Sequence, residues 1–111
     1  MYKIGEFVEM TGLSKETLRY YAEVKLLEPA YIDPVTRYRY YDDGSYFEAV
    51  LLAKLRRFGF TIQEMSAVMK DESFAHLEAL LEQKRENKRM QIQDLLAQVE
   101  EIDEFLASGR E

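Results

Sequence analysis

Apolar residues in the first part of the chain recur every three or four positions, the spacing of short helices that each bury one face. A first helix is predicted over residues 4–10, and Gly12 provides a left-handed stop after it. Ser14 is a typical N-cap, so a second helix should begin there. The apolar positions of the two helices are Ile4, Phe7, Val8, Met10, Leu18, Tyr21 and Val24. Two short helices joined by a tight turn form a helix-turn-helix pattern, whose second helix enters the major groove of DNA.

Beyond Pro29 the helical spacing gives way to short runs of β-forming residues. Residues 31–32 and 37–41 are such runs, and residues 33–36, Asp-Pro-Val-Thr, have turn chemistry. The pattern predicts a two-stranded hairpin. An isolated hairpin is marginal in water, so this one should pack on the helices. Its exposed Arg37 and Arg39 would then project as a wing.

Two further helices are predicted from their caps. Asp42 or Asp43 can cap a helix that runs to about residue 57, with Gly59 as its stop. Residues 61–64, Thr-Ile-Gln-Glu, form a capping box for a short fourth helix. The positions expected to face the core are Phe47, Val50, Leu51, Ala53, Leu55, Phe58, Met65, Val68 and Met69.

A long helix is predicted from about Ser73 to Leu106, because this stretch lacks proline and glycine and is rich in helix formers. At 1.5 Å per residue it would be about 50 Å long, more than a small domain can cover. From Ile92 onward its apolar steps alternate between three and four, as in a coiled coil. The predicted dimerisation seam consists of Leu81, Ile92, Leu95, Val99, Ile102 and Leu106. The expected domains are therefore 1–70 and 71–111.

The charges of this helix favour an antiparallel homodimer. Basic residues gather in 84–89 and acidic residues in 100–104. In an antiparallel pair centred between Asp94 and Leu95, these oppositely charged stretches face each other. Each surface pair contributes only about 0.2–1 kcal/mol, but choosing between two arrangements of one seam requires only a small difference. The alternative is a helix that folds back on its own domain.

Composition changes this picture in two ways. The 111 residues carry a net charge of −6, yet residues 1–70 are neutral and the whole excess lies in residues 71–111. Basic residues in the first part are interleaved with tyrosines, a composition typical of nucleic-acid binding. The chain has no cysteine, which excludes disulfides and thiolate metal sites and suits a reducing cytosol. It has no secretion signal and no apolar run long enough to span a membrane, so a cytoplasmic protein without membrane association is expected.

Four ordered motifs resemble the mercury-resistance-regulator (MerR) family of bacterial transcription factors. They are Lys3–Glu6, Ser14–Tyr21, Tyr38–Tyr41 and Phe58–Met65, and the match covers residues 2–69. The resemblance implies a mainly α fold: a winged helix-turn-helix DNA-binding domain with a small β-hairpin wing, followed by a long coiled-coil helix that forms an antiparallel dimer.

The details of the resemblance point to one branch of the family. Residues 28–36 look most like the multidrug-binding branch, whereas Lys25 and Arg37 stand where many relatives have glycine. That branch carries an effector domain after the helix, and this chain stops at Glu111. A small-molecule inducer is therefore expected only if a further domain exists. The family's metal sensors use cysteines near the helix, so metal sensing by that route is excluded, and no cofactor is expected.

The residues expected to contact DNA follow from the predicted elements and the resemblance. They are Lys15, Thr17, Arg19, Tyr20, Arg37, Tyr38, Arg39 and Arg56. Lys15 and Thr17 in the first turn should reach base edges, and the Tyr20 hydroxyl a phosphate, whereas Tyr21 should pack inward. Three of these positions also have a purely structural explanation: a solvated surface cation for Arg19, cross-strand pairing for Arg39, and a helix C-terminal cation for Arg56.

Catalytic chemistry has no support in the sequence. The chain has no phosphate-cradling glycine loop, and its single histidine, His76, lies beside acidic residues in a surface pattern. The sequence therefore predicts a regulator, not an enzyme, that binds a palindromic promoter operator as a homodimer. The resemblance further implies that it distorts the promoter spacer for RNA polymerase. The alternative is a coiled-coil module that binds another protein and no DNA.

Overall fold

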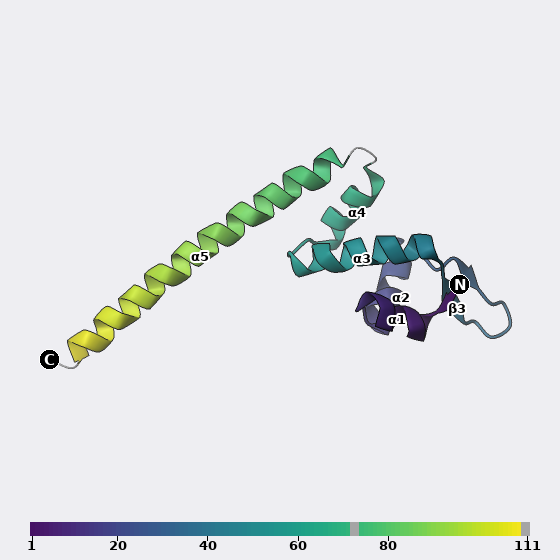
Figure 1. Ribbon diagram of the computed structural model, residues 1–111, viewed down its shortest axis with the longest axis horizontal. Helices are drawn as coiled ribbons and strands as arrows, with labels where there is room; N and C mark the ends of the chain where they lie inside the picture. Colours follow the sequence, from purple (N-terminus) through teal and green to yellow (C-terminus); the bar gives the residue numbers. More distant parts are fainter. Residues whose placement is uncertain (72–73, 110–111) are drawn as a thin grey trace. The chain divides into compact units, whose positions relative to one another are not determined.

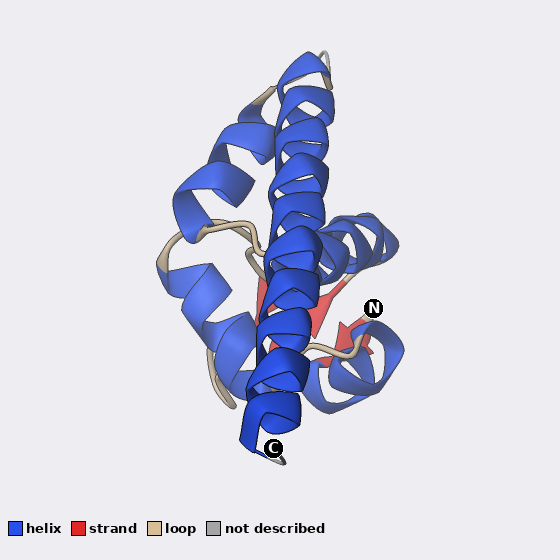
Figure 2. Cartoon of the chain, turned by 90° about the vertical axis from the view of Figure 1, so that its left-hand side faces the viewer, coloured by secondary structure: helices blue, strands red, loops and turns tan. Residues whose placement is uncertain are grey.

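The computed structural model describes residues 1–71 and 74–109, and its contacts divide the chain into two compact units, 1–72 and 73–111. Most of the described chain is helix, with a small amount of strand (Figure 2). The elements of the first unit are β1 (Tyr2–Lys3), α1 (Ile4–Thr11), α2 (Lys15–Glu23), β2 (Tyr31–Ile32), β3 (Arg39–Tyr41), α3 (Asp43–Arg57) and α4 (Ile62–Lys70). Figure 1 labels its four helices and β3. The second unit is α5 (Ala75–Gly109). The predicted fold class is confirmed.

The turn between α1 and α2 has the predicted local chemistry. Gly12 lies in the left-handed region with φ +77°, and its N–H donates to the Val8 carbonyl. A side chain at this φ would be strained, which explains the glycine. Ser14 then caps α2, because its Oγ accepts a hydrogen bond from the Thr17 N–H at 3.1 Å.

The sheet has three strands in the order β1-β3-β2, all antiparallel. Lys3 of β1 pairs with Tyr40, which on its other side pairs with Tyr31 of β2. The sequence prediction missed β1, since two residues are too few to show an alternating pattern. The Tyr2 hydroxyl also donates to Asp43 Oδ1 at 2.8 Å. The N-terminus thus ties the hairpin to the start of α3, in addition to the helices expected to support it.

The hairpin is shorter than predicted on its second strand. Strand β3 begins at Arg39, whereas the sequence pattern favoured a strand from Arg37. Asp33 organises the turn, since its Oδ1 accepts from the N–H groups of Val35 and Thr36 and its carbonyl accepts from the Arg37 N–H. Arg37 closes this turn in the left-handed region with φ +66°, so it cannot continue the strand.

The core of the first unit joins all four helices to the sheet. The rings of Phe7 and Tyr41 stack with centroids 4.4 Å apart. The buried side chains are Phe7, Leu13, Leu18, Tyr21, Leu26, Leu27, Tyr41, Ala49, Leu52, Leu55, Phe60, Met65 and Val68. Val24 and Met10 are exposed, so the expectation that they face the core is wrong. Met69 is half-buried, so that expectation is partly right.

The predicted inward face of α3 is only partly right: Leu55 is buried as expected, but Phe47 and Phe58 are not. Ala49, Leu52 and Leu55 are buried, whereas Phe47 is 71% exposed and Phe58 lies at the surface. The expected positions Val50, Leu51 and Ala53 are half-buried. This helix carries apolar residues on more than one side, so a spacing of three and four fits two different faces. Only the packing against α1 and the sheet selects one of them.

The end of α2 contains a strained residue, Lys25. The Leu26 N–H donates to the Tyr21 carbonyl at 2.8 Å and the Lys25 N–H to the Ala22 carbonyl at 3.2 Å, which is a Schellman cap. Lys25 occupies its left-handed position with φ +60°, a conformation that glycine adopts most easily. The backbone thus keeps the glycine-type turn although the sequence has lysine there.

Lys25→Gly is therefore expected to stabilise the protein. Relief of the left-handed strain, less the extra flexibility of an unfolded glycine, should add about 1 kcal/mol to the free energy of unfolding. This corresponds to a rise in Tm of about 4–8 °C for a domain of this size. Thermal melting followed by circular dichroism checks it. Lys25→Ala is the matched control, because it removes the amine and keeps the strain; an equal gain from alanine would contradict the explanation.

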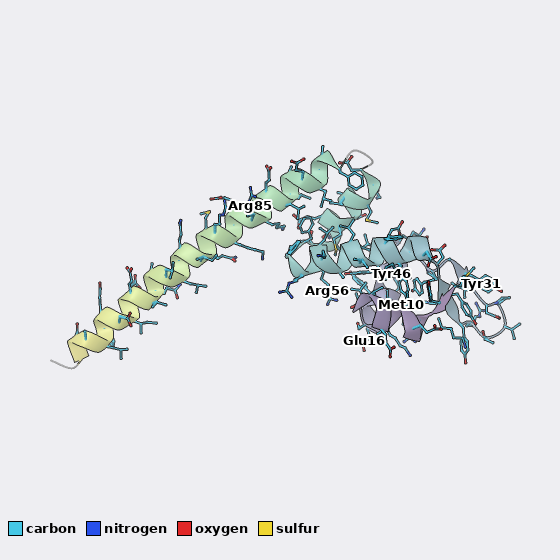
Figure 3. The ribbon with its side chains drawn as sticks, viewed as in Figure 1. Met10, Glu16, Tyr31, Tyr46, Arg56 and Arg85 are labelled. Atoms are coloured by element: carbon cyan, nitrogen blue, oxygen red, sulfur yellow. The ribbon has the colours of Figure 1, made fainter. Side chains whose placement is uncertain are left out.

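The described part of the second unit consists mainly of α5, which has no buried side chain over residues 75–109. Helix α5 is described from Ala75, and the predicted start at Ser73 lies outside the described residues. Its end lies at Gly109, three residues beyond the predicted Leu106. The Ser108 hydroxyl donates to the Glu104 carbonyl, which supports this last turn. Side chains extend from α5 on all sides along its length (Figure 3).

Candidate nucleic-acid interface

Helix α2 has one buried face and one exposed basic and aromatic face. Leu18 and Tyr21 are buried, and Tyr21 is only 2% exposed. Tyr20 is 47% exposed, and Lys15 and Arg19 are also exposed. The expected division between an outward Tyr20 and an inward Tyr21 is confirmed. Burial raises the pKa of the Tyr21 hydroxyl, with the nearby Arg56 guanidinium acting in the opposite direction.

Thr17 is held within the protein more than the sequence suggested. Its Oγ1 accepts hydrogen bonds from Ser14 Oγ at 2.9 Å and from Arg56 Nη1 at 3.1 Å. Thr17 is half-buried. Because its oxygen accepts both bonds, the hydroxyl proton and the methyl group remain for an external partner. Arg56 is labelled at the C-terminal end of α3 in Figure 3. The structure thus joins two predicted contact residues, from α2 and α3, in one hydrogen-bonded group.

The wing presents its charged residues in two different ways. Arg37 and Tyr38 lie in the exposed turn, and Tyr38 is 58% exposed. Backbone N–H groups of Thr36 and Val35 lower the pKa of Asp33, so this turn aspartate is firmly ionised at neutral pH. A hydrogen bond to an ionised carboxylate is stronger than one to a neutral acceptor. The two bonds to the Asp33 carboxylate therefore fix the turn that carries Arg37.

Arg39 does not project freely, in contrast to the expectation of an exposed wing arginine. It is half-buried in β3, and its Nη1 atom is buried without a hydrogen-bond partner among the described residues. The guanidinium lies beside the Tyr41 hydroxyl, whose pKa is raised by burial and lowered by Arg39. The reason is the alternation of the strand, which places Arg39 on the same face of β3 as the buried Tyr41.

Lys3 is a basic residue near this surface that the sequence analysis did not assign to it. Its Nζ atom lies 6.0 Å from the centroid of the Tyr38 ring. The signal was present in the Lys3–Glu6 motif, but the position of Lys3 depends on β1. Because that strand was not predicted, the motif alone did not place Lys3 beside the wing.

The predicted seam of α5 is exposed in the single chain. Leu95 is 59% exposed, and the other members from Ile92 to Leu106 have exposed fractions between 52% and 57%. Leu81 is half-buried. A continuous row of exposed aliphatic side chains on one helix marks an interaction surface.

Among the described residues, no group of three or more His, Asp or Glu side chains is arranged to hold a metal ion. Within the same residues, no helix is both long and apolar enough to cross a membrane.

The arrangement of a capped helix-turn-helix, a hairpin wing and a long exposed helix defines a winged helix-turn-helix DNA-binding protein. Residues 2–72 match the model of the MerR HTH family of regulatory proteins. The chain belongs to this family, whose members are transcription regulators.

Relatives of known sequence and structure agree with this assignment. The multidrug-efflux transporter 1 regulator of Bacillus subtilis (strain 168) is 41% identical over 64 residues, which cover 58% of this chain and 23% of that protein. The structure of EcmrR with DNA, from the assembly EcmrR-RPo, is 34% identical with a TM-score of 0.76; the match covers 94% of this chain and 38% of EcmrR.

The fold also matches the N-terminal part of the multidrug transporter activator Mta of Bacillus subtilis, at 24% identity and a TM-score of 0.81. That match covers 96% of this chain and 98% of the solved one, so the fold similarity extends over both units. The chain spans less than half the length of the B. subtilis regulator and of EcmrR.

Proposed function

We propose that this protein binds a palindromic promoter operator as a homodimer and changes the shape of the DNA to control transcription. The observation that carries the proposal is the exposure of Lys15, Arg19 and Tyr20 on α2, a helix that buries Leu18 and Tyr21 in the core. In a helix-turn-helix protein this helix enters the major groove, where arginine and lysine read guanine and tyrosine contacts phosphate.

The residues around α2 supply the remaining contacts. Arg37 and Tyr38 on the wing are exposed and suited to the DNA backbone, and Arg56 has guanidinium N–H groups beyond the one that binds Thr17. Half-buried Arg39 is proposed to reach a phosphate or the minor groove with the exposed part of its side chain. Backbone contacts of this kind fix the register of the protein on the duplex.

Dimerisation is proposed to occur through the exposed seam of α5. Burial of a leucine or isoleucine side chain contributes about 1.5–3 kcal/mol, so pairing of two seams is strongly favourable. An antiparallel pair brings the basic stretch 84–89 of one chain to the acidic stretch 100–104 of the other. The resulting two-fold axis would place two α2 helices in successive major grooves about 34 Å apart, which requires a palindromic operator.

Control of transcription would follow from the shape of the bound DNA. Bending an operator costs on the order of 1–6 kcal/mol, which the wing and Arg56 contacts must offset. The structure of EcmrR with DNA supports DNA and RNA polymerase as partners. The site of action would be the cytoplasm of a bacterium. Since the chain spans only 23% of the B. subtilis regulator, a small-molecule inducer is proposed only for a protein with a further domain.

The experiment that tests this function is the salt dependence of binding to an inverted-repeat promoter duplex, measured by fluorescence anisotropy. A dimer that makes 6–10 phosphate contacts should lose about 10³–10⁵ in affinity between about 50 and 200 mM salt. An interaction module that uses α5 for another protein would bind no duplex at the lowest salt concentration. That outcome would reject the proposed function in favour of the coiled-coil alternative.

A further inference from the structure

A hollow lies where the N-terminus, the start of α2 and the wing meet. Its polar lining comprises Lys3 and Glu6 from the N-terminal segment, Lys15 from the first turn of α2, and Tyr38 and Arg39 from the wing. Three cationic side chains thus meet one carboxylate. Such a local excess of positive charge is unexpected in a unit whose residues 1–70 are neutral. The hollow is suited to an anion.

Lys3 is held in this hollow by two independent features. The pairing of β1 with β3 fixes its backbone, because Lys3 lies opposite Tyr40. The Tyr38 ring, 6.0 Å from Nζ, attracts the ammonium group without neutralising it. An ordered cation that keeps its full charge loses less entropy when it binds an anion than a free surface lysine does.

Two further features add positive charge in the same place. Arg39 lines the hollow, although its Nη1 atom is buried and has no hydrogen-bond partner among the described residues. The first turn of α1 also lines the hollow through Gly5, and no side chain caps this helix at Lys3. These groups add to the positive potential that Lys3 and Lys15 create in the hollow.

We propose that this hollow binds one backbone phosphate of the DNA duplex, with Lys3 as a contact residue alongside Lys15 and Arg39. The inference rests on the proposed DNA-binding function. A duplex that receives α2 in its major groove and touches the wing must pass over the space between them, and the hollow lies there. The anion is therefore a phosphodiester group and not a free small molecule.

The test uses Lys3→Gln and a fluorescein-labelled mixed-sequence duplex, titrated at several salt concentrations. Loss of one phosphate contact in each protomer should reduce the slope of log affinity against log salt by about 0.9 per protomer. Lys3→Arg should restore the slope, since it restores the charge. Glu6→Gln should strengthen binding, because it removes the carboxylate that lines the hollow. Thermal melting confirms that each variant is folded.

Lys54→Gln is the matched control. Lys54 is an exposed cation of α3, about 200° around the helix from Arg56, which faces α2. An equal slope change in Lys54→Gln and Lys3→Gln would show a general charge effect and overturn the phosphate site. Arg19→Ala, measured in parallel, separates the two proposals. If it weakens binding while Lys3→Gln matches the wild type, only the phosphate site is rejected.

A further experiment tests whether the hollow binds a phosphate of DNA or a free phosphate ion. Inorganic phosphate added without DNA should leave the backbone amide NMR signals of Lys3 and Gly5 unchanged at millimolar concentration. The duplex should shift them. Saturable shifts with inorganic phosphate that Lys3→Gln abolishes would identify a free-anion site and contradict the assignment to DNA. A wild-type protein that binds no duplex would reject both this site and the proposed function.

Discussion

Leu95→Glu is expected to convert the proposed homodimer into monomers and to remove most of its affinity for an inverted-repeat duplex. Leu95 lies next to the proposed centre of the seam, so the two substituted residues would place like charges close together in an apolar interface. The loss of two buried leucine side chains alone costs roughly 3–6 kcal/mol, or about two to four orders of magnitude in the dimer dissociation constant. The unpaired carboxylates add to this cost.

The prediction can be checked by sedimentation equilibrium together with duplex binding. Leu95 is 59% exposed in the single chain, so its replacement leaves the core of residues 1–72 intact. Met90→Glu is the matched control, because Met90 is 60% exposed but lies about 140° around the helix from Leu95. Dimers of normal stability in Leu95→Glu, or equal loss in both variants, would count against the seam.

Arg19→Ala is expected to produce the second large effect, a loss of operator affinity with little change in stability. Arg19 is exposed on α2 one residue after the buried Leu18, and it contributes nothing to the core. A base-reading arginine contributes about 1–3 kcal/mol, and a two-fold dimer loses it twice. The dissociation constant should therefore rise by between roughly 30-fold and 10⁴-fold.

This effect should also be selective for sequence. Loss of a base contact relaxes discrimination between operator variants, whereas loss of a phosphate contact weakens all duplexes equally. Binding of Arg19→Ala to operator and mixed-sequence duplexes distinguishes the two roles, with Lys54→Ala as the control cation. Arg39→Ala should also weaken binding, but its half-buried position makes a stability change part of the result. If neither arginine variant changes the affinity, the assignment of this surface is wrong.

The caps of the helices could be predicted from the sequence because each depends on neighbours three residues away. Ser14 caps α2, as expected. Thr61 caps α4 and forms the expected capping box with Glu64. Asp42 is the cap of α3, which settles the choice between Asp42 and Asp43. A hydrogen bond between a side chain and a nearby backbone N–H needs no information from the rest of the fold.

The surface proposed to bind DNA could be predicted less completely than the helix caps. Tyr20 and Tyr21 point as expected, because α2 has one clear apolar face. The engagement of Thr17 by Arg56 was not foreseen, since these residues lie 39 positions apart. The burial of Arg39 and the position of Lys3 both depend on how the strands of the sheet pair. Neither the run of β-forming residues 37–41 nor the two residues of β1 reveal this pairing in the sequence.

The sequence by itself determined the order of the helices, their caps, the hairpin, the long terminal helix with its apolar seam, and the family. These features arise from residue spacing and local hydrogen bonds, so a linear pattern contains them. Only the tertiary structure decided which face of α3 is buried, how the N-terminus joins the sheet, and which basic side chains meet beside α2. Those outcomes depend on long-range packing between segments whose separate patterns are each compatible with more than one arrangement.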